Sequence, residues 1–238
     1  MEKTKQRYMG VGAVIALLAL GMVVLFPPLL LADDMRKAQG LVDRARVTFS
    51  GFMRDSNYGW LHKNVDHAKG VLIFPQILKG GFIWGGSGGT GVFMVRDERT
   101  GKWSDPAFYT LGSVTFGLQI GGESAEVVMV AMTKKAVDSL LSSSFKLGGD
   151  VSIALGPLGG GAKASADIPS VTGDFVSFAK SKGLYAGLNL EGAVIAVRDG
   201  LNKGYYGKGG VRPADIIVMK EVRDSHSAGL RETLRCKC

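Results

Sequence analysis

Hydrophobic residues recur at helical spacing in one early segment of the chain, from about Asp34 to Arg54. Their three- and four-residue intervals place them on one face of a helix: Ala38, Leu41, Val42, Ala45, Phe49, Phe52 and Met53. Arg46 borders this face on one side, and Lys37 and Arg44 border it on the other. Such a helix either docks its apolar face on a domain core, which is the usual case, or lies on an anionic membrane surface.

From Gly70 onward the pattern changes to short β-type runs separated by glycines, and 35 glycines in the chain favour turns, bulges and close backbone contacts. Strands are predicted at 71–74, 82–84, 92–96, 107–111, 114–120, 126–132, 151–155, 161–166, 175–178, 184–190, 193–197 and 215–219. Further helices are predicted at 58–68, 134–143 and 199–205. The expected fold class is α+β, with a strongly curved, glycine-rich antiparallel sheet or barrel-like core and peripheral helices.

The amino terminus is a separate hydrophobic element, expected to be helical. Lys3, Lys5 and Arg7 form a basic flank, and the apolar stretch from Met9 to Ala32 is long enough to span a membrane. Residues 1–32 are therefore predicted to be a signal sequence or a transmembrane anchor, and cleavage stays open. Either outcome places the main domain, residues 33–220, on the non-cytoplasmic side of a membrane, anchored or exported. Residues 221–238 form a charged C-terminal tail.

The charge balance favours anionic partners. Residues 33–238 carry 26 Lys and Arg against 20 Asp and Glu, a formal charge of +6. An exported domain would rarely meet nucleic acid, so we expect phospholipid headgroups and no nucleic acid. The two cysteines lie in the last three residues and the chain has three histidines, so neither a core disulfide nor a metal or other cofactor is expected.

The glycine-rich stretch from Gly85 to Gly91 matches both a dinucleotide fingerprint and the nucleophile elbow of hydrolases, with Ser87 as the nucleophile. Both patterns require a helix directly afterwards, whereas the continuation Val92-Phe-Met-Val-Arg96 is typical of a strand. We therefore interpret the stretch as a glycine-bent β turn or crossing. The carboxylates are dispersed singly, and we expect no enzymatic activity.

Several motifs identify a family. The segment Gly183-Leu-Tyr-Ala-Gly-Leu-Asn-Leu-Glu-Gly192 resembles the signature of the SYLF domain. The resemblance covers roughly residues 35 to 220, since further motifs occur in that family's order: Ala68 to Pro75, Gly85 to Gly91, Trp103 to Pro106, Gly117 to Gly121, Gly156 to Gly159 and Tyr205 to Gly207. It implies non-catalytic binding of anionic phospholipid headgroups of the phosphoinositide or phosphatidic acid type. An alternative is a protein-interaction module, with actin as partner only by family analogy, and a less favoured one is a hydrolase using Ser87.

Basic residues near glycine turns and on the first helix are the candidate lipid contacts, because each cation near an anionic surface strengthens binding. They are Lys37, Arg44, Arg46, Lys69, Lys79, Lys180 and Lys182.

Overall fold

The computed structural model describes residues 27–81, 84–116, 121–157, 172–182 and 190–236. None of the helices in these ranges is long and apolar enough to cross a membrane. The hydrophobic segment 1–32 falls largely outside the described ranges, so its helix, the choice between anchor and signal, and the resulting location remain predictions.

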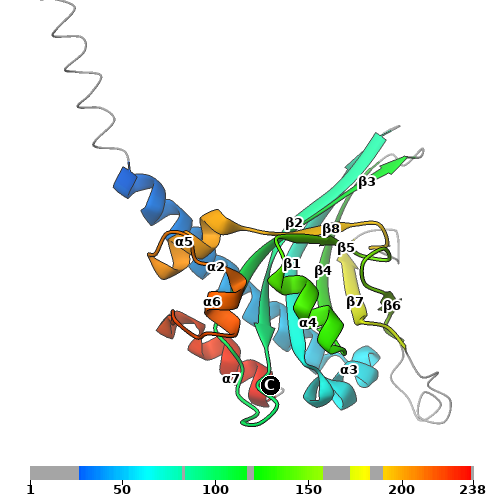
Figure 1. Ribbon diagram of the computed structural model, residues 1–238. Coiled ribbons are helices and arrows are strands. Elements are labelled where there is room, and N and C mark those ends of the chain that lie inside the picture. The colour runs from blue at the N-terminus through cyan, green and yellow to red at the C-terminus, as the bar shows by residue number, and fades with distance from the viewer. Residues whose placement is uncertain (1–26, 82–83, 117–120, 158–171, 183–189, 237–238) are drawn as a thin grey trace, which may run out of the picture.

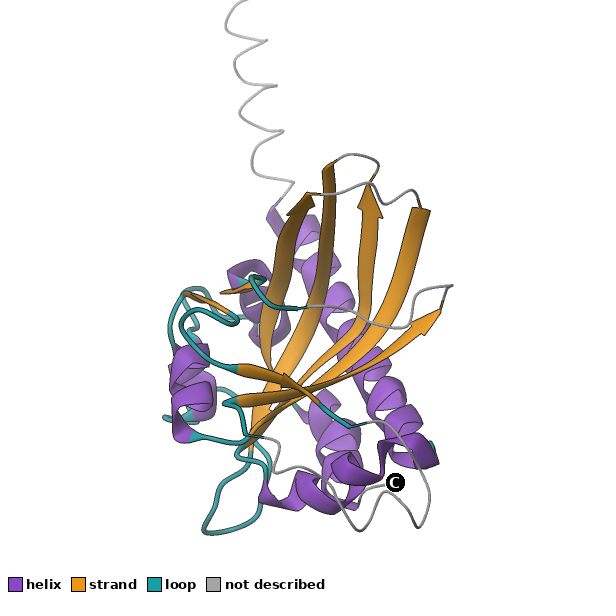
Figure 2. Ribbon diagram, turned by 90° about the vertical axis from the view of Figure 1, so that its right-hand side faces the viewer, coloured by secondary structure: helices purple, strands orange, loops and turns teal. Residues whose placement is uncertain are grey.

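A single sheet of eight strands forms the centre of the molecule, in the order β5-β8-β3-β2-β1-β4-β7-β6 (Figure 1, Figure 2). The strands are β1 (Gly70–Gly81), β2 (Trp84–Val95), β3 (Ala107–Phe116), β4 (Gly121–Ala131), β5 (Ser144–Lys146), β6 (Ile153–Leu155), β7 (Phe175–Lys182) and β8 (Val194–Val197). All neighbouring pairs are antiparallel except β6 and β7, which are parallel. The predicted α+β class with a strongly curved, glycine-rich sheet is confirmed.

Helices cover both faces of this sheet. The long α2 (Pro27–Arg54) lies along one face, with α5 (Asp199–Tyr206) and α7 (Ala228–Cys236) against it (Figure 1). The segment predicted as one helix at 58–68 consists of η1 (Ser56–Tyr58), α3 (Gly59–Asn64) and η2 (Val65–His67). On the other face lie α4 (Lys134–Leu141) and α6 (Pro213–Ile217), and η4 (Ser225–Ser227) precedes α7.

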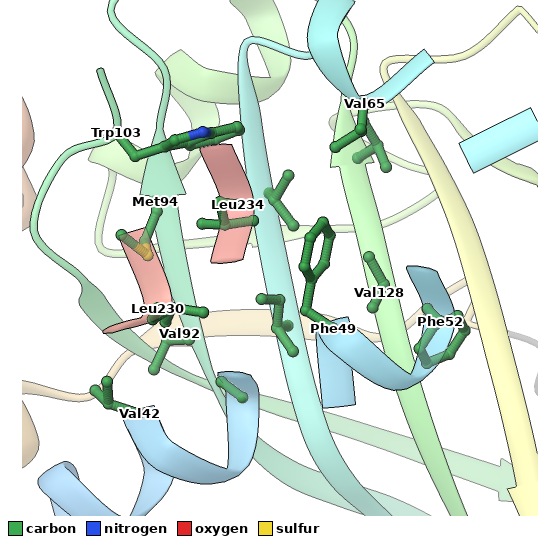
Figure 3. Close-up of a cluster of buried hydrophobic side chains, with 14 of the residues drawn as sticks. Val42, Phe49, Phe52, Val65, Val92, Met94, Trp103, Val128, Leu230 and Leu234 are labelled. Atoms are coloured by element: carbon green, nitrogen blue, oxygen red, sulfur yellow. The ribbon is translucent and has the colours of Figure 1, made fainter. Parts of the chain in front are cut away.

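The apolar face of α2 is buried on the sheet. Phe49 and Phe52 are fully buried and pack among residues of β1, β2 and β4, with Leu230 and Leu234 of α7 in the same cluster (Figure 3). Burial of each large side chain contributes roughly 1.5–3 kcal/mol of stability. The core alternative for this helix is therefore confirmed, because the apolar face from Ala38 to Met53 packs on the sheet and is not available to lie on a membrane.

The central strands extend beyond this core. Ile73, Val92 and Phe108 face α2 and are fully buried. Farther along the same face, Leu78 of β1 pairs with Gly88 of β2, which pairs with Gly112 of β3. The far halves of β1 to β3 project away from the helices (Figure 1). One face of the sheet is thus covered at one end and open at the other.

The strands differ from the sequence prediction in length. Six predicted runs between 71 and 132 are four strands of 10 to 12 residues, and Gly85 to Gly91 lies inside β2 instead of forming a turn or crossing. The irregularity lies opposite, as a register shift in β1 between Ile73 and Gln76. Glycines recur in this part of the sequence without ending the strands, because each glycine keeps the backbone N–H and C=O groups that cross-strand hydrogen bonding requires. The strands predicted at 161–166 and 184–190 lie outside the described residues, apart from Leu190.

The strand predicted at 215–219 is wrong, because residues Pro213–Ile217 form the helix α6. Pro213 occupies the first turn, where a missing amide hydrogen costs nothing, and Asp215 accepts a hydrogen bond of 2.9 Å from the Arg212 amide. These local start signals outweigh the apolar run Ile216-Ile-Val218, which alone suggests a strand.

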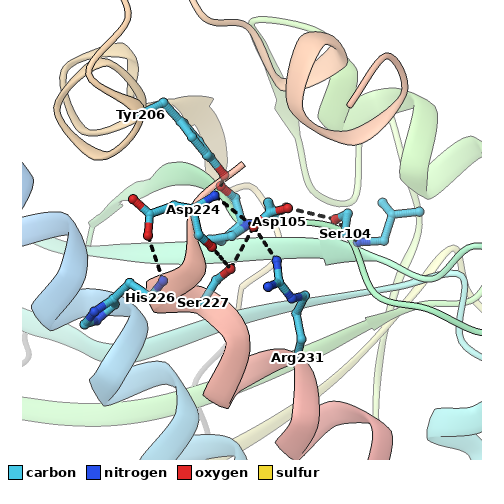
Figure 4. Close-up of polar contacts among 9 residues, drawn as sticks. Ser104, Asp105, Tyr206, Asp224, His226, Ser227 and Arg231 are labelled. Carbon is cyan, nitrogen blue, oxygen red and sulfur yellow. Dashed lines mark hydrogen bonds and ion pairs between the residues drawn. The ribbon is translucent and has the colours of Figure 1, made fainter. Parts of the chain in front are cut away.

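The C-terminal segment is tied to the loop between β2 and β3 through Asp105 (Figure 4). The carboxylate of Asp105 accepts a 2.8 Å hydrogen bond from the Ser227 hydroxyl and forms an ion pair with Arg231. In addition, the Tyr206 hydroxyl donates to the carbonyl oxygen of Pro106 at 2.7 Å. Residues 221–236, set apart in the sequence as a charged tail, thus hold η4 and the buried leucines of α7, and the motif from Trp103 to Pro106 has a structural role.

The close approach of β2 to β1 at Gly91 predicts that a larger residue there destabilises the fold. A Cβ atom there would lie 2.6 Å from the Ile73 carbonyl oxygen and 2.6 Å from the Phe74 ring. We expect Gly91→Ala to lower the free energy of unfolding by about 1–3 kcal/mol in urea titration. Gly88→Ala is the matched control, since its Cβ would meet nothing closer than 3.7 Å, and it should be neutral or stabilising. Equal losses for both variants would contradict this packing.

A second prediction concerns Asp105. Asp105→Asn removes the charge that compensates Arg231, whose side chain is only 30% exposed, and should cost about 2–3 kcal/mol of unfolding free energy. The control Asp138→Asn breaks an exposed pair with Lys134 and should change the same quantity by less than about 0.5 kcal/mol. If Asp105→Asn is as mild as the control, the leucines alone hold α7 in place.

Candidate functional site

A groove of about 520 Å³ lies where the open part of the sheet meets α2 and the start of α5. Its sheet side consists of small and polar positions, among them Gln76, Thr90 and Thr110, together with the backbone of Gly88 and Gly89. Its helix side carries three cations, and apolar residues complete the lining: Lys37, Arg44 and Arg198 are the cations, and Leu41, Pro75, Leu78, Leu111 and Leu201 are apolar.

Helical geometry brings Lys37 and Arg44 together. They are seven residues apart, which is close to two full turns, so both lie on the same side of α2 with Leu41 between them. Leu41 is buried and holds this side of the helix against the core, and Lys37 and Arg44 on either side of it line the groove. Lys37 and Arg44 thus lie at the border of the apolar face of α2, as the sequence predicts.

Arg198 reaches the groove from a distant part of the chain. It occupies the N-cap of α5, and its amide donates a 2.9 Å hydrogen bond to the Phe108 carbonyl oxygen at the start of β3. The helix α5 sits close to α2 because Gly204 meets Asp34, where an added Cβ would lie 2.6 Å from the Asp34 Cβ. This contact sets the distance of Arg198 from the cations of α2.

The electrostatic balance of the groove is positive. No carboxylate lines it among the described residues, and neither Arg44 nor Arg198 has an ion-pair partner within them. Lys37 pairs with Asp33, whose hydrogen bond and charge raise the lysine pKa; the charge of Asp34 adds to that rise and the charge of Arg198 opposes it. Three cations therefore share one solvent-exposed groove whose described lining holds no carboxylate, with Asp33 and Asp34 acting on Lys37 alone of the three, which makes the groove suited to an anionic ligand.

A larger depression of about 630 Å³ next to Trp103 has a different charge balance. There Lys220 lies 3.0 Å from Asp97, and its ammonium group holds the pKa of that carboxyl at about 2. Arg231 is likewise paired with Asp105. Lys102 and Arg223 also line the depression, as does the carboxylate of Asp224, so its four cations share the space with three carboxylates and it is a weaker candidate for anion binding.

The structure brings two of the seven predicted contact residues together, Lys37 and Arg44. Arg46 points toward α7, with a guanidinium nitrogen near Gly229, and Lys79 extends from β1 between Ser87 and Glu123 on the neighbouring strands. The remaining three lie elsewhere: Lys69 pairs with Glu98, Lys180 lies 3.2 Å from Asp55, and Lys182 ends β7, with its side chain outside the described part.

Sequence reasoning missed Arg198. It follows the alternating run of β8 and precedes a short helix, a position that carries no periodic signal. An arginine directly before Asp199-Gly200 is a weak sequence signal of a helix start. Only the tertiary contact of α5 with α2 makes Arg198 part of a site.

The surroundings of Ser87 and of the potential metal ligands do not match a catalytic or metal site within the described residues. Ser87 lies within β2 with its hydroxyl 2.7 Å from that of Ser113, whereas a nucleophile elbow requires a strand-to-helix turn. His62 contacts the carbonyl oxygen of Phe52 at 3.0 Å. Within the described ranges no group of three or more His, Cys, Asp or Glu side chains is arranged to hold a metal ion.

Comparison with known proteins adds independent information. The family described as "Ysc84: Las17-binding protein actin regulator" matches residues 112–236, a little over half of the chain. LAS seventeen-binding protein 3 of Saccharomyces cerevisiae is 38% identical over 143 residues, which is 59% of this chain and 30% of that protein. SH3 domain-containing YSC84-like protein 1 of Homo sapiens is 31% identical over 168 residues, which is 70% of this chain and 48% of that protein. No solved structure matches.

The similarity to these relatives is partial in length. The chain spans about a third of the yeast protein and about half of the human protein. The family match begins within β3, at residue 112, and continues to residue 236; it therefore includes Arg198, while Lys37 and Arg44 precede it.

Proposed function

Because this chain belongs to the Ysc84 family, described as Las17-binding protein actin regulators, we propose that it is a non-catalytic binding module. The position of Ser87 within a continuous strand supports a role without catalysis. The three-cation groove supports association with an anionic partner.

The names of the relatives favour a protein partner over a lipid. One relative is named for binding LAS seventeen, and the family description names actin regulation. A protein partner that fits this chain would present acidic side chains to Lys37, Arg44 and Arg198, since unpaired arginines bind carboxylates bidentately.

The geometry of the groove favours a second candidate, the headgroup of an anionic phospholipid such as phosphatidic acid or a phosphoinositide. Its mouth is exposed, its cations come from two helices, and backbone and hydroxyl groups of β2 and β3 lie opposite them. Phosphate oxygens accept several charge-assisted hydrogen bonds at once, which such an arrangement supplies. The single observation that carries this candidate is the convergence of three cations without a carboxylate in the described lining.

The lipid candidate predicts a charge-dependent interaction. The full chain should bind phosphatidic acid liposomes, bind phosphatidylcholine liposomes far less, and release as salt rises, because exposed charges are screened. Reversing the groove with Lys37→Glu, Arg44→Glu and Arg198→Glu should weaken binding roughly 100-fold or more at low salt, given about fivefold for each cation near an anionic surface. Co-sedimentation measures both effects.

A matched control separates a site from net charge. Lys63, Arg99 and Arg223 are exposed, have no ion pair in the described part of the chain, and repeat the one-lysine, two-arginine composition of the groove. Their reversal to Glu should weaken liposome binding much less. Equal losses for the two triple variants would show that only net charge matters and that the groove is not the site.

Co-sedimentation with actin filaments tests the protein candidate with the same variants. Binding of the full chain to filaments, lost on reversal of the groove cations and kept in the control, would support the protein partner. If both triple variants bind filaments as well as the natural sequence does, the protein contact lies elsewhere on the molecule.

A further inference from the structure

An uncovered apolar surface adjoins the basic groove on the open part of the sheet. Leu78 of β1, Val114 of β3 and Val194 of β8 all point to the α2 side and are 57%, 81% and 44% exposed. Between them lie Gly88 and Gly112, and a Cβ added at Gly112 would meet no atom within 4 Å. We name Leu78, Val114 and Val194, with the two glycines between them, the open sheet face.

The open sheet face and the groove form one continuous surface. Leu78 lines the groove and also begins a cross-strand row that continues through Gly88 and Gly112 to Val194. This row crosses three inter-strand spacings, about 14 Å. The apolar face of α2 is already buried on the core, so this sheet surface is the apolar area that the cations of α2 border.

We propose that the open sheet face receives one acyl chain of an anionic lipid whose phosphate lies in the basic groove. This inference rests on the lipid candidate of the proposed function and adds the hydrophobic half of the ligand. A lipid satisfies both halves of the surface, with its charge against Lys37, Arg44 and Arg198 and its chain against Leu78, Val114 and Val194.

The chemistry of the surface favours an acyl chain over a protein segment. At each position of the row the strand is paired on both sides: Leu78 with β4 and β2, Gly88 with β1 and β3, Gly112 with β2 and β8, and Val194 with β3 and β5. Beyond Gly112, the described residues pair β3 with β2 only. An extended peptide lying along this row would find no free backbone partner and would bury its own polar groups unpaired. A hydrocarbon chain has no such groups, so contact with a sheet face suits it.

A chain-length series tests the proposal. The full chain is titrated with octyl, decyl and dodecyl phosphate below their aggregation concentrations, with inorganic phosphate as the headgroup alone. Affinity should rise about two- to fourfold for each methylene, because a chain on an open face leaves water on one side only. Leu78→Gln with Val114→Gln should flatten this dependence. Gly112→Gln, placed in open space, should do the same without disturbing the core.

Two comparisons keep the outcomes distinct. The control Val218→Gln with Met219→Gln removes two apolar side chains of 59% and 50% exposure beyond α6 and should leave the chain-length dependence unchanged. Reversal of the three groove cations should weaken every phosphate probe while keeping the dependence on length. A flat series in the natural sequence, or equal flattening in the control, overturns the acyl-chain site. Indifference of every probe to cation reversal overturns the proposed headgroup site instead.

Discussion

The packing of α2 on the sheet is the interaction on which the rest of the structure depends. Ala38, Val42, Ala45, Phe49 and Phe52 are fully or almost fully buried against strands whose inward residues continue the same cluster. This packing buries the apolar side of the helix and determines which of its residues face outward. The strands are longer than the part of the sheet that the helices cover. The groove therefore forms where the cations of α2 and Arg198 lie next to the uncovered part of the sheet.

The sequence predicted this helix well, because its 3.6-residue periodicity directly reports the buried face, and Lys37 and Arg44 share a border for the same reason. It predicted the strands less well. Glycines such as Gly86 and Gly88 suggest that a strand ends there, yet both are paired with β1 and β3, and β2 continues without interruption. Arg198 joins the site only through the tertiary contact at Gly204, which no local pattern encodes. Lys180 lies away from the groove, beside Asp55 at the other end of α2.

The candidate functions share one physical requirement, an anionic partner for three cations with little internal compensation. The depression next to Trp103 shows the contrast, since the carboxylates of Asp97, Asp105 and Asp224 line it together with its cations, and Asp97 and Asp105 form ion pairs with Lys220 and Arg231. An acidic protein surface would use the charges of the groove alone. An anionic lipid would also use the open sheet face, whose exposed Leu78, Val114 and Val194 have no role in the core.

The most direct test of this account is the orientation of the molecule on an anionic membrane. Spin labels are placed at Val114→Cys or at Val218→Cys, with Cys236 and Cys238 replaced by serine, and their accessibility to an aqueous relaxation agent is measured with and without phosphatidic acid liposomes. The account predicts that the label at position 114 is shielded on binding and the label at 218 stays accessible, because only the former lies beside the groove. Shielding at 218 with position 114 left in water would contradict it.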